Sequence, residues 1–334
     1  MASADTGRSA GPWLVWGIGT VVLLAAFWIV AYGTGWSPTI DSCALNDSCY
    51  CEWFDLTALQ QAAANHKAWF GVQQPINTYS NFYAIVTSGY VACRMWRDRK
   101  DTTHDPATSN MLVSQSYLGE VWVFCVLFLG LGSMWFHGSM SAGFSWFDSC
   151  SMFVFAAFLV FYTLDRLLIQ KGCSPASRNW TFWVGYPLTV VGFTAIGVIN
   201  ISSTSEPKHI PSIYLVALLV LVYIILEHWV KFIWTVKARI WWFIGLGSFV
   251  AAAFFRAMST HGANPMKDGV IDLKNGVVDW LCWPHSWFQP HGLLWHTLSG
   301  VMALCMYIYW REDTGGTGRS APPVNSDVIG LHWG

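Results

Sequence analysis

Residues 117–140, YLGEVWVFCVLFLGLGSMWFHGSM, and residues 145–165, SWFDSCSMFVFAAFLVFYTLD, decide the fold of this chain. Both are almost uninterrupted apolar runs. An α-helix rises ~1.5 Å per residue, so either run is long enough to cross the ~30 Å hydrocarbon layer of a bilayer. Only the short stretch 141–144 separates them. We therefore predict two antiparallel transmembrane helices joined by a tight loop.

Six further stretches have the same length and character, and turn formers and charged residues fill the segments between them. The pattern predicts an all-α polytopic membrane helix bundle, with a seven-helix core preceded by an extra N-terminal transmembrane helix. The six other predicted spans are residues 12–34, 77–94, 180–200, 210–230, 239–257 and 291–310.

The composition agrees with a membrane location. Of the 334 residues, 54% are hydrophobic and 11% are charged, whereas a soluble domain carries roughly 25% charged residues. The 22 Trp and 12 Tyr suit the two membrane–water interfaces. A net charge of -1 excludes a strongly basic nucleic-acid binder.

The distribution of Lys and Arg predicts the topology. When alternate loops are assigned to one side, thirteen of the 18 basic residues fall on the side that holds both termini. The positive-inside rule places that side in the cytoplasm. The loop between the spans 117–140 and 145–165 then lies on the extracytoplasmic side.

Four regions follow from this topology: a tail and membrane anchor (1–35), an extracytoplasmic segment (36–76), the seven-helix core (77–311) and a disordered cytoplasmic tail (312–334). The alternative for the first region is a cleaved signal peptide, although its apolar run exceeds the ~7–15 residues of a signal. Residues 54–70 have a helical period, which predicts either a helix lying on the interface or a solvated loop helix.

Four of the nine cysteines, Cys43, Cys49, Cys51 and Cys282, fall in predicted extracytoplasmic segments. Only these would face an oxidising space. They allow three pairings, and the residues alone do not choose among them.

Ionisable side chains inside spans are expensive and are functional candidates. His137, Asp148, His291 and His296 all fall at the predicted extracytoplasmic ends of three spans. Three imidazoles with an open fourth position form the ligand set of a catalytic zinc ion, which lowers the pKa of a bound water to ~7. Singly, each histidine is more simply a hydrogen-bonded side chain, but their common depth favours a metal site.

Two more residues complete the predicted site. Ser133 lies four positions before His137, on the same helix face, and its hydroxyl suits an oxyanion donor. Asp148 suits a general acid/base that orients water and carries its proton to the leaving amine. The simpler alternatives are a packing role for Ser133 beside Gly130 and Gly132, and helix N-capping by Asp148.

Other polar span residues lie at the predicted inner ends, where either snorkelling to the interface or a salt bridge with nearby Arg and Lys explains them. We assign no chemistry to them. They are Glu120, Asp165, Glu227 and His228.

Several motifs resemble the alkaline ceramidases, which belong to a superfamily of seven-helix membrane hydrolases that also includes the adiponectin receptors. GSMWFHGSM at 132–140 is followed by Asp148 eleven residues after His137, and the last span carries a Trp-His pair. INTYSNFYAIVTSGY at 76–90 is similar to the family's first-helix motif, and Cys51-Glu52 resembles its amino-terminal segment. The resemblance covers roughly residues 50–310.

The resemblance implies zinc ligands at His137, His291 and His296, with Ser133 and Asp148 as assisting residues. It also implies a disulfide between the amino-terminal segment and the loop before the last helix. That disulfide would join Cys51 to Cys282 and leave Cys43 and Cys49 to pair with each other.

The chain departs from the family pattern at two points. His291 and His296 are five residues apart rather than four, about 140° apart on a regular helix. They reach one ion if His291 lies in the first turn after Pro290 or if the helix carries a π-bulge, and His285 is the alternative ligand. The family's calcium site is not expected here, because Gln74 stands where an acidic ligand is needed, although Glu52 fits.

The sequence therefore predicts a zinc-dependent intramembrane amidase that hydrolyses ceramide-like lipids to a long-chain base and a fatty acid. The main alternative is a seven-helix receptor or lipid-binding protein of the same superfamily with a zinc site. A transporter or channel is a third possibility, since intramembrane charges also mark ion paths. However, transporters break helices near the midplane, whereas this cluster lies at one end. The oligomeric state does not follow from the sequence.

Overall fold

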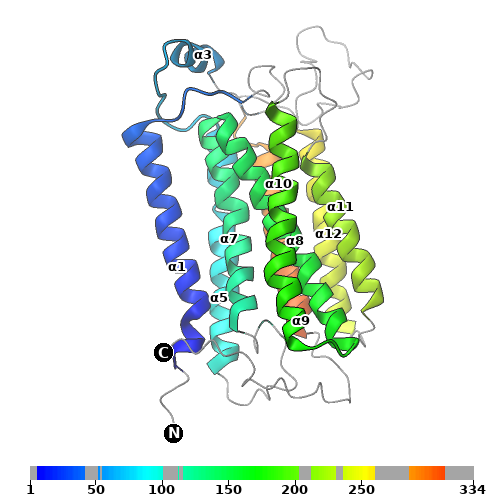
Figure 1. The fold of residues 1–334 in the computed structure, drawn as a ribbon. Helices are drawn as coiled ribbons and strands as arrows, with labels where there is room; N and C mark the ends of the chain where they lie inside the picture. Colours follow the sequence, from blue (N-terminus) through cyan, green and yellow to red (C-terminus); the bar gives the residue numbers. More distant parts are fainter. Residues whose placement is uncertain are drawn as a thin grey trace.

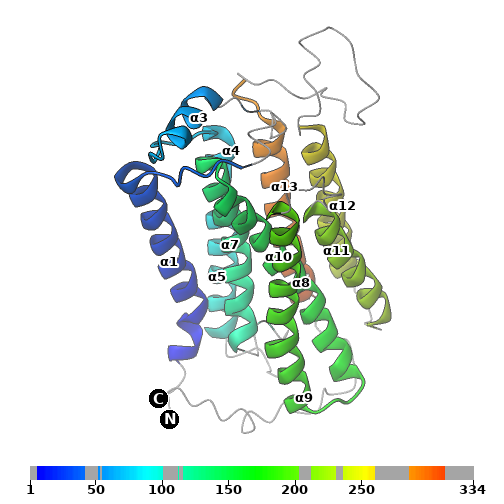
Figure 2. The same cartoon turned by 45° about the horizontal axis from the view of Figure 1, so that its top comes forward.

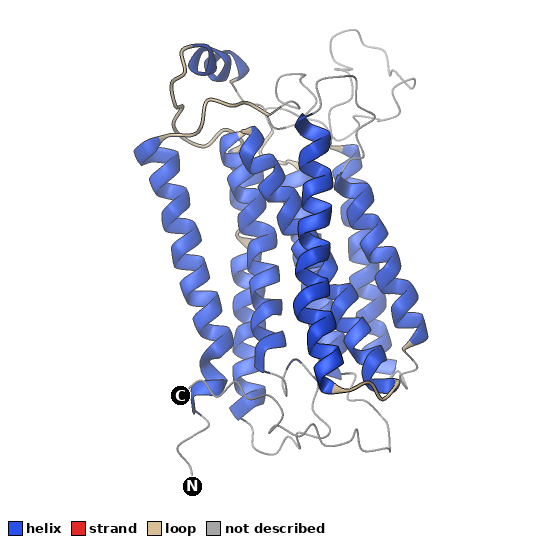
Figure 3. Ribbon diagram, viewed as in Figure 1, coloured by secondary structure: helices blue, strands red, loops and turns tan. Residues whose placement is uncertain are grey.

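The computed structural model describes residues 6–41, 52, 55–100, 112, 116–202, 212–230, 236–259 and 286–312. Over these residues the chain is an all-α polytopic membrane bundle, as predicted, with no β-strand (Figures 1 and 3). Six segments are long and apolar enough to cross a membrane: Gly11–Thr34, Tyr117–Ser139, Ala142–Gln170, Ser212–Trp229, Ala238–Arg256 and His291–Glu312.

Successive long helices run in opposite directions, so the first turn of α1 and the last turn of α13 lie at the same end of the bundle (Figures 1 and 2). The short helices α3 and α4 lie at the other end, which we call the α3 end. The helices are α1 (Thr6–Ile29) with the π-helical turn η1 (Val30–Thr34), α3 (Leu56–Ala64), α4 (Pro75–Ser80), α5 (Tyr83–Lys100), α7 (Ser116–Ser139), α8 (Ala142–Gln170), α9 (Pro175–Trp180), the π-helical turn η2 (Thr181–Gly185), α10 (Tyr186–Ser202), α11 (Ser212–Trp229), α12 (Val236–Met258), the π-helical turn η4 (His291–His296) and α13 (Thr297–Glu312).

The predicted spans at 77–94 and 180–200 are helical, but neither helix is both long and apolar enough to count as a membrane span by length and composition. The last turns of α5 carry a run of charged residues from Arg97 to Lys100, and α10 has only 17 residues. Both helices nevertheless belong to the bundle, because α5 packs on α7 and α10 packs on α8. Six of the eight predicted spans are thus confirmed as helices long and apolar enough to cross a membrane, and the other two crossings stay predictions.

A cluster of aromatic side chains joins α7, α8 and α13. Trp122 of α7, Phe158 and Tyr162 of α8, and Trp310 of α13 are nearly inaccessible. Their ring centroids lie 4.4 to 6.1 Å apart. Each such pair contributes ~0.5–1.5 kcal/mol beyond the burial of its area. The cluster therefore fixes α7, α8 and α13 against one another.

The N-terminal helix packs against this body. The indole N–H of Trp16 donates to the carbonyl of Ile85 at 2.9 Å. A Cβ placed on Gly138 would lie 2.8 Å from the ring of Phe27. Glycine thus permits the close approach of two helices, as small residues do in membrane bundles. The last turns of α1 consequently lie against the end of α7.

The first span of the core is interrupted, which the sequence did not predict. The Ser80 hydroxyl and the Asn81 side-chain amide both donate to the carbonyl of Asn77, at 3.0 and 2.8 Å. Such side chains compete with the helical backbone for its hydrogen bonds. The helix therefore stops at Ser80, and α5 starts at Tyr83.

Buried ion pairs fasten the helices at the end opposite α3. The carboxylate of Glu227 accepts hydrogen bonds from Arg166 at 2.6 Å and from Thr163 and Tyr309 at 2.9 Å, so α8, α11 and α13 meet at one group. The predicted pairing of Glu120, Asp165 and Glu227 is confirmed. Further pairs at this end are Arg99–Glu120, Arg178–Asp165 and Arg311–Asp98, each at 2.7 Å.

A short helix lies between the N-terminal helix and the core, as predicted, although α3 covers less than residues 54–70. The side chain of Asp55 accepts from the N–H of Ala58 at 2.9 Å and starts the helix. Some predictions fall outside the described residues. These are the pairings of Cys43, Cys49, Cys51 and Cys282, the alternative ligand His285, and the tail beyond Glu312.

Replacing Glu227 by leucine should strongly destabilise the protein, by ~3–5 kcal/mol, because it leaves the Arg166 guanidinium buried without its carboxylate. Thermal unfolding of the detergent-solubilised protein measures the loss. A second replacement, Arg166→Leu, should restore most of the stability, since no uncompensated charge then remains. A double variant no more stable than Glu227→Leu would contradict this assignment.

Candidate metal centre

Three histidines from distant parts of the chain meet at the α3 end of the bundle. His137 lies in the last turn of α7, and His291 and His296 bound η4. The Nε2 atoms of His137 and His291 are 3.2 Å apart. One ring nitrogen from each histidine lies within 4.8 Å of those of the other two. The predicted convergence is confirmed, and the three side chains are 0 to 2% exposed.

The π-helical turn explains how two histidines five residues apart reach one point. Hydrogen bonds in a π-helix join residues i and i+5, so residues with this spacing lie on one side of the turn. η4 starts immediately after Pro290 and ends at His296. The predicted π-bulge is therefore present, and it places His291 in the first turn after Pro290.

Gly292 allows η4 to pack closely on α4. A Cβ at Gly292 would lie 2.7 Å from Oδ1 of Asn77 and 3.0 Å from Oγ of Ser80. Both contacts are too close for an ordinary Cβ, and both atoms belong to the short helix that precedes α5. The packing of η4 on α4 (Figure 2) thus brings polar side chains next to the histidines.

The geometry of the cluster fits a single ion. Two nitrogens bound to one tetrahedral zinc ion lie about 3.3 Å apart, close to the 3.2 Å between His137 and His291. Imidazole nitrogen suits several transition metals. The group can therefore hold a metal ion, although the donor set alone does not fix which one.

Gln74 determines which nitrogen of His137 is available to a metal. Its side-chain N–H donates to the backbone carbonyl of Glu52 at 3.0 Å, so its oxygen must face Nδ1 of His137, at 2.7 Å. An amide oxygen only accepts. Nδ1 of His137 therefore carries the proton, and the lone pair on Nε2 points to the metal position.

Ser80 determines in the same way which nitrogen of His296 is available to a metal. Its hydroxyl donates to the carbonyl of Asn77, so its oxygen accepts from Nδ1 of His296 at 2.7 Å. The lone pair of His296 is again on Nε2. Such partners orient the imidazole and raise its affinity for a metal.

The sequence reasoning missed both orienting residues. Gln74 was considered only as a substitution in a cation site, and Ser80 only as part of a motif. The sequence did contain a signal for them, because polar residues cluster at the start of an apolar span. Polar side chains that are buried there need hydrogen-bond partners.

Ser133 and Asp148 also lie at the cluster. The Ser133 hydroxyl is 3.4 Å from Nε2 of His296, and the Ser133 side chain interacts with the carboxyl group of Asp148. N-capping by Asp148 is ruled out, because α8 begins at Ala142 with Ser141 as its N-cap residue. All five predicted site residues are thus brought together.

Arg256 adds a positive charge that the sequence reasoning used only for topology. It lies in the last turn of α12, with its guanidinium 5.7 Å from the centroid of the Trp295 ring. It interacts electrostatically with Asp148, His137 and His291. The cluster therefore combines metal-ligating, hydroxyl, carboxyl and guanidinium groups.

Glu52 closes the cluster on the side of the segment before α4. Burial raises the pKa of its carboxyl group, and hydrogen bonds from the backbone N–H groups of Asn77 and Ile76 oppose that shift. Both carboxylate oxygens are engaged in these bonds, at 2.7 Å each. Neither oxygen is left as a free calcium ligand in this arrangement.

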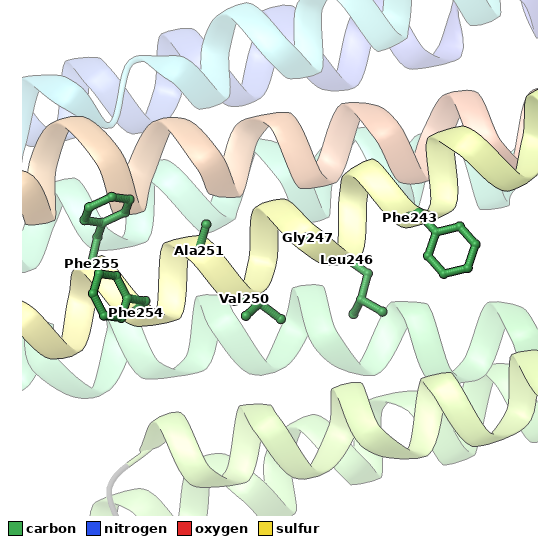
Figure 4. A pocket seen from close by; sticks show the side chains of 7 residues that line it. All are labelled: Phe243, Leu246, Gly247, Val250, Ala251, Phe254 and Phe255. Atoms are coloured by element: carbon green, nitrogen blue, oxygen red, sulfur yellow. The ribbon is translucent and has the colours of Figure 1, made fainter.

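An apolar groove of about 670 Å³ runs along α12 (Figure 4). Phe243, Val250 and Phe254 are more than half exposed along it. Such a surface suits acyl chains rather than water. The groove is lined by Phe243, Leu246, Gly247, Val250, Ala251, Phe254 and Phe255.

Comparison of the chain with protein-family models, curated proteins and solved structures finds no match.

Replacing Gln74 by leucine should lower metal affinity about 10- to 100-fold, because it removes the group that fixes the His137 tautomer. Competition with a chromophoric chelator measures the affinity. Gln73→Leu is the matched control, since within the described part of the chain the hydrogen bond of Gln73 is made by its backbone N–H, which donates to the carbonyl of Gly138. Equal affinities in the two variants would show that Gln74 does not orient the ligand.

Proposed function

We propose that this protein is a zinc-dependent intramembrane amidase that hydrolyses the N-acyl amide bond of ceramide-like sphingolipids to a long-chain base and a fatty acid. One observation carries the proposal. The Ser133 hydroxyl lies 3.4 Å from the metal-facing nitrogen of His296, and the Ser133 side chain interacts with the carboxyl group of Asp148. A purely structural metal site has no need of a hydroxyl and a carboxyl group beside its ligands.

The roles of the residues follow from their positions. Three imidazoles leave the fourth position of a zinc ion open, where the ion can polarise a carbonyl and lower the pKa of water to ~7. Ser133 can donate a hydrogen bond to the oxygen on which negative charge develops. Asp148, next to Ser133, can accept the proton of the attacking water and deliver it to the departing amine.

The surroundings favour a lipid substrate. The cluster lies at one end of an all-helical membrane bundle, so an amide near the lipid–water interface lies at the right depth. The groove on α12 offers a wholly apolar surface for a chain. The motifs shared with the alkaline ceramidases point to the same substrate class.

The orientation in the membrane is also part of the proposal. Among the described residues, the basic side chains gather at the end opposite α3, and only Lys67 and Arg256 lie at the α3 end. By the positive-inside rule, both termini face the cytoplasm and the metal centre faces the extracytoplasmic side.

Hydrolysis of a fluorescent ceramide by the purified protein in detergent tests the activity. We expect fatty acid release by the wild type and none by His137→Ala, which lacks a ligand. His228→Ala, an exposed histidine at the opposite end, should retain full activity. Equal release by the wild type and His137→Ala would rule out the hydrolase and leave a receptor or lipid-binding protein.

Metal analysis tests the ion separately. We expect one zinc per chain in the wild type and none in His296→Ala, because two imidazoles hold the ion too weakly to survive purification. A different metal, or undiminished zinc in His296→Ala, would contradict the assignment.

Ser133→Ala should keep its zinc and lose ~10²–10³-fold in kcat, as expected when one oxyanion donor is removed. KM should change little, since the hydroxyl acts mainly on charge that develops during the reaction. An unchanged kcat would reduce Ser133 to the packing role beside Gly130 and Gly132.

A further inference from the structure

Glu52 uses its carboxylate and its backbone carbonyl to hold the elements around the metal centre. The carboxylate accepts from the N–H groups of Ile76 and Asn77, at 2.7 Å each. The carbonyl accepts from the side chain of Gln74 at 3.0 Å. Glu52 is 5% exposed, so water does not replace these bonds easily.

The bonds of Glu52 lead to two metal ligands by separate routes. Its carbonyl fixes the amide of Gln74, whose oxygen holds Nδ1 of His137. Its carboxylate holds the start of α4, whose last residue, Ser80, holds Nδ1 of His296. One residue of the segment before α4 thus acts on imidazoles from two different helices.

The short helix α4 depends on this anchoring. It has six residues, and a helix of that length is not stable by itself. The backbone N–H of Gln74 donates to the carbonyl of His137 at 3.1 Å, which joins the start of α4 to the end of α7. If Glu52 left its place, α4 would lose the bonds at its first turn and Ser80 would no longer be held under His296.

We propose that Glu52 is a positioning residue that latches α4 onto the metal centre, so that metal binding and the placement of Glu52 against α4 depend on each other. Such coupling is reciprocal. If the contacts of Glu52 with α4 raise the metal affinity by some factor, bound metal raises the equilibrium constant for forming those contacts by the same factor. The inference rests on the proposed metal centre and deepens it, because it makes the segment before α4 part of the site.

Glu52→Gln tests the latch with little change in volume. Glutamine offers one acceptor oxygen where two N–H groups need one each, and it turns an amide N–H toward the other donor. We expect zinc affinity, measured by chelator competition on the full chain, to fall about 10-fold or more. Asp55→Ala is the matched control. It removes the N-cap of α3, and Asp55 is exposed and makes no hydrogen bond to a site residue among the residues described, so zinc affinity should stay within twofold of the wild type.

Hydrogen exchange tests the reciprocal effect without relying on activity. In the wild type, zinc should slow the exchange of the Ile76 and Asn77 amides at least tenfold relative to the chelated protein. The same amides should respond little to zinc in Glu52→Gln. The wild-type measurement stands alone if the variant does not fold. His291→Ala supplies a second comparison, since it removes a ligand from the other side of the site and should leave these amides in the fast-exchanging state.

The outcomes separate the two proposals. A wild type that takes up no zinc overturns the metal centre and the latch together. A wild type that binds zinc, with Glu52→Gln binding it equally tightly or with amides of Ile76 and Asn77 indifferent to zinc, overturns only the latch. A loss of affinity of similar size in Asp55→Ala would also overturn it, because the effect would then come from general loosening of the segment.

Discussion

Imidazole rings buried at the end of a membrane bundle need a partner for each nitrogen, and this constraint shapes everything around them. His137 places Nε2 3.2 Å from Nε2 of His291, and His296 places Nε2 3.4 Å from the Ser133 hydroxyl, so Nδ1 of His137 and of His296 needs a partner on the opposite side of each ring. Gln74 and Ser80 provide those contacts for His137 and His296. Gln74 reaches His137 because the start of α4 packs on the end of α7, and Ser80 reaches His296 because α4 packs on η4.

The two ends of the bundle satisfy their polar groups in different ways. At the end opposite α3, carboxylates meet guanidinium groups, as Glu227 meets Arg166, and each pair ties helices into a fixed arrangement. At the α3 end, the contacts behind the histidines are neutral hydrogen bonds from an amide and a hydroxyl. Neutral partners leave the imidazoles free to donate electron pairs to an ion. The charged pairs therefore hold the scaffold, while the neutral network shapes the site.

Much of this arrangement was predictable from the sequence. Long apolar runs gave the helices, because a chain in hydrocarbon must satisfy its backbone internally. The alternation of spans placed His137, Asp148, His291 and His296 at one depth. The local geometry of the site depends on packing between helices, which the sequence does not show. The spacing of His291 and His296 left several solutions open, and the fit of Gly292 against Asn77 is a contact between elements far apart in the chain.

The break after Ser80 was missed for a related reason. An apolar period predicts a continuous helix there, whereas the structure uses the hydroxyl of Ser80 and the amide of Asn81 to end it. Periodicity measures which face of a helix is apolar. It does not show when a polar side chain will take a backbone partner.

The identity of residue 74 follows from the same chemistry. The side chain there meets a carbonyl oxygen of Glu52 on one side and an imidazole N–H of His137 on the other. It must therefore donate and accept at once in fixed directions, which an amide does and a carboxylate does not. A glutamate at this position would set its second oxygen against the carbonyl of Glu52, and only a proton or a bound cation between them would relieve the repulsion. With glutamine, the chain closes the contact using its own atoms, and the carboxylate of Glu52 is left to hold the start of α4.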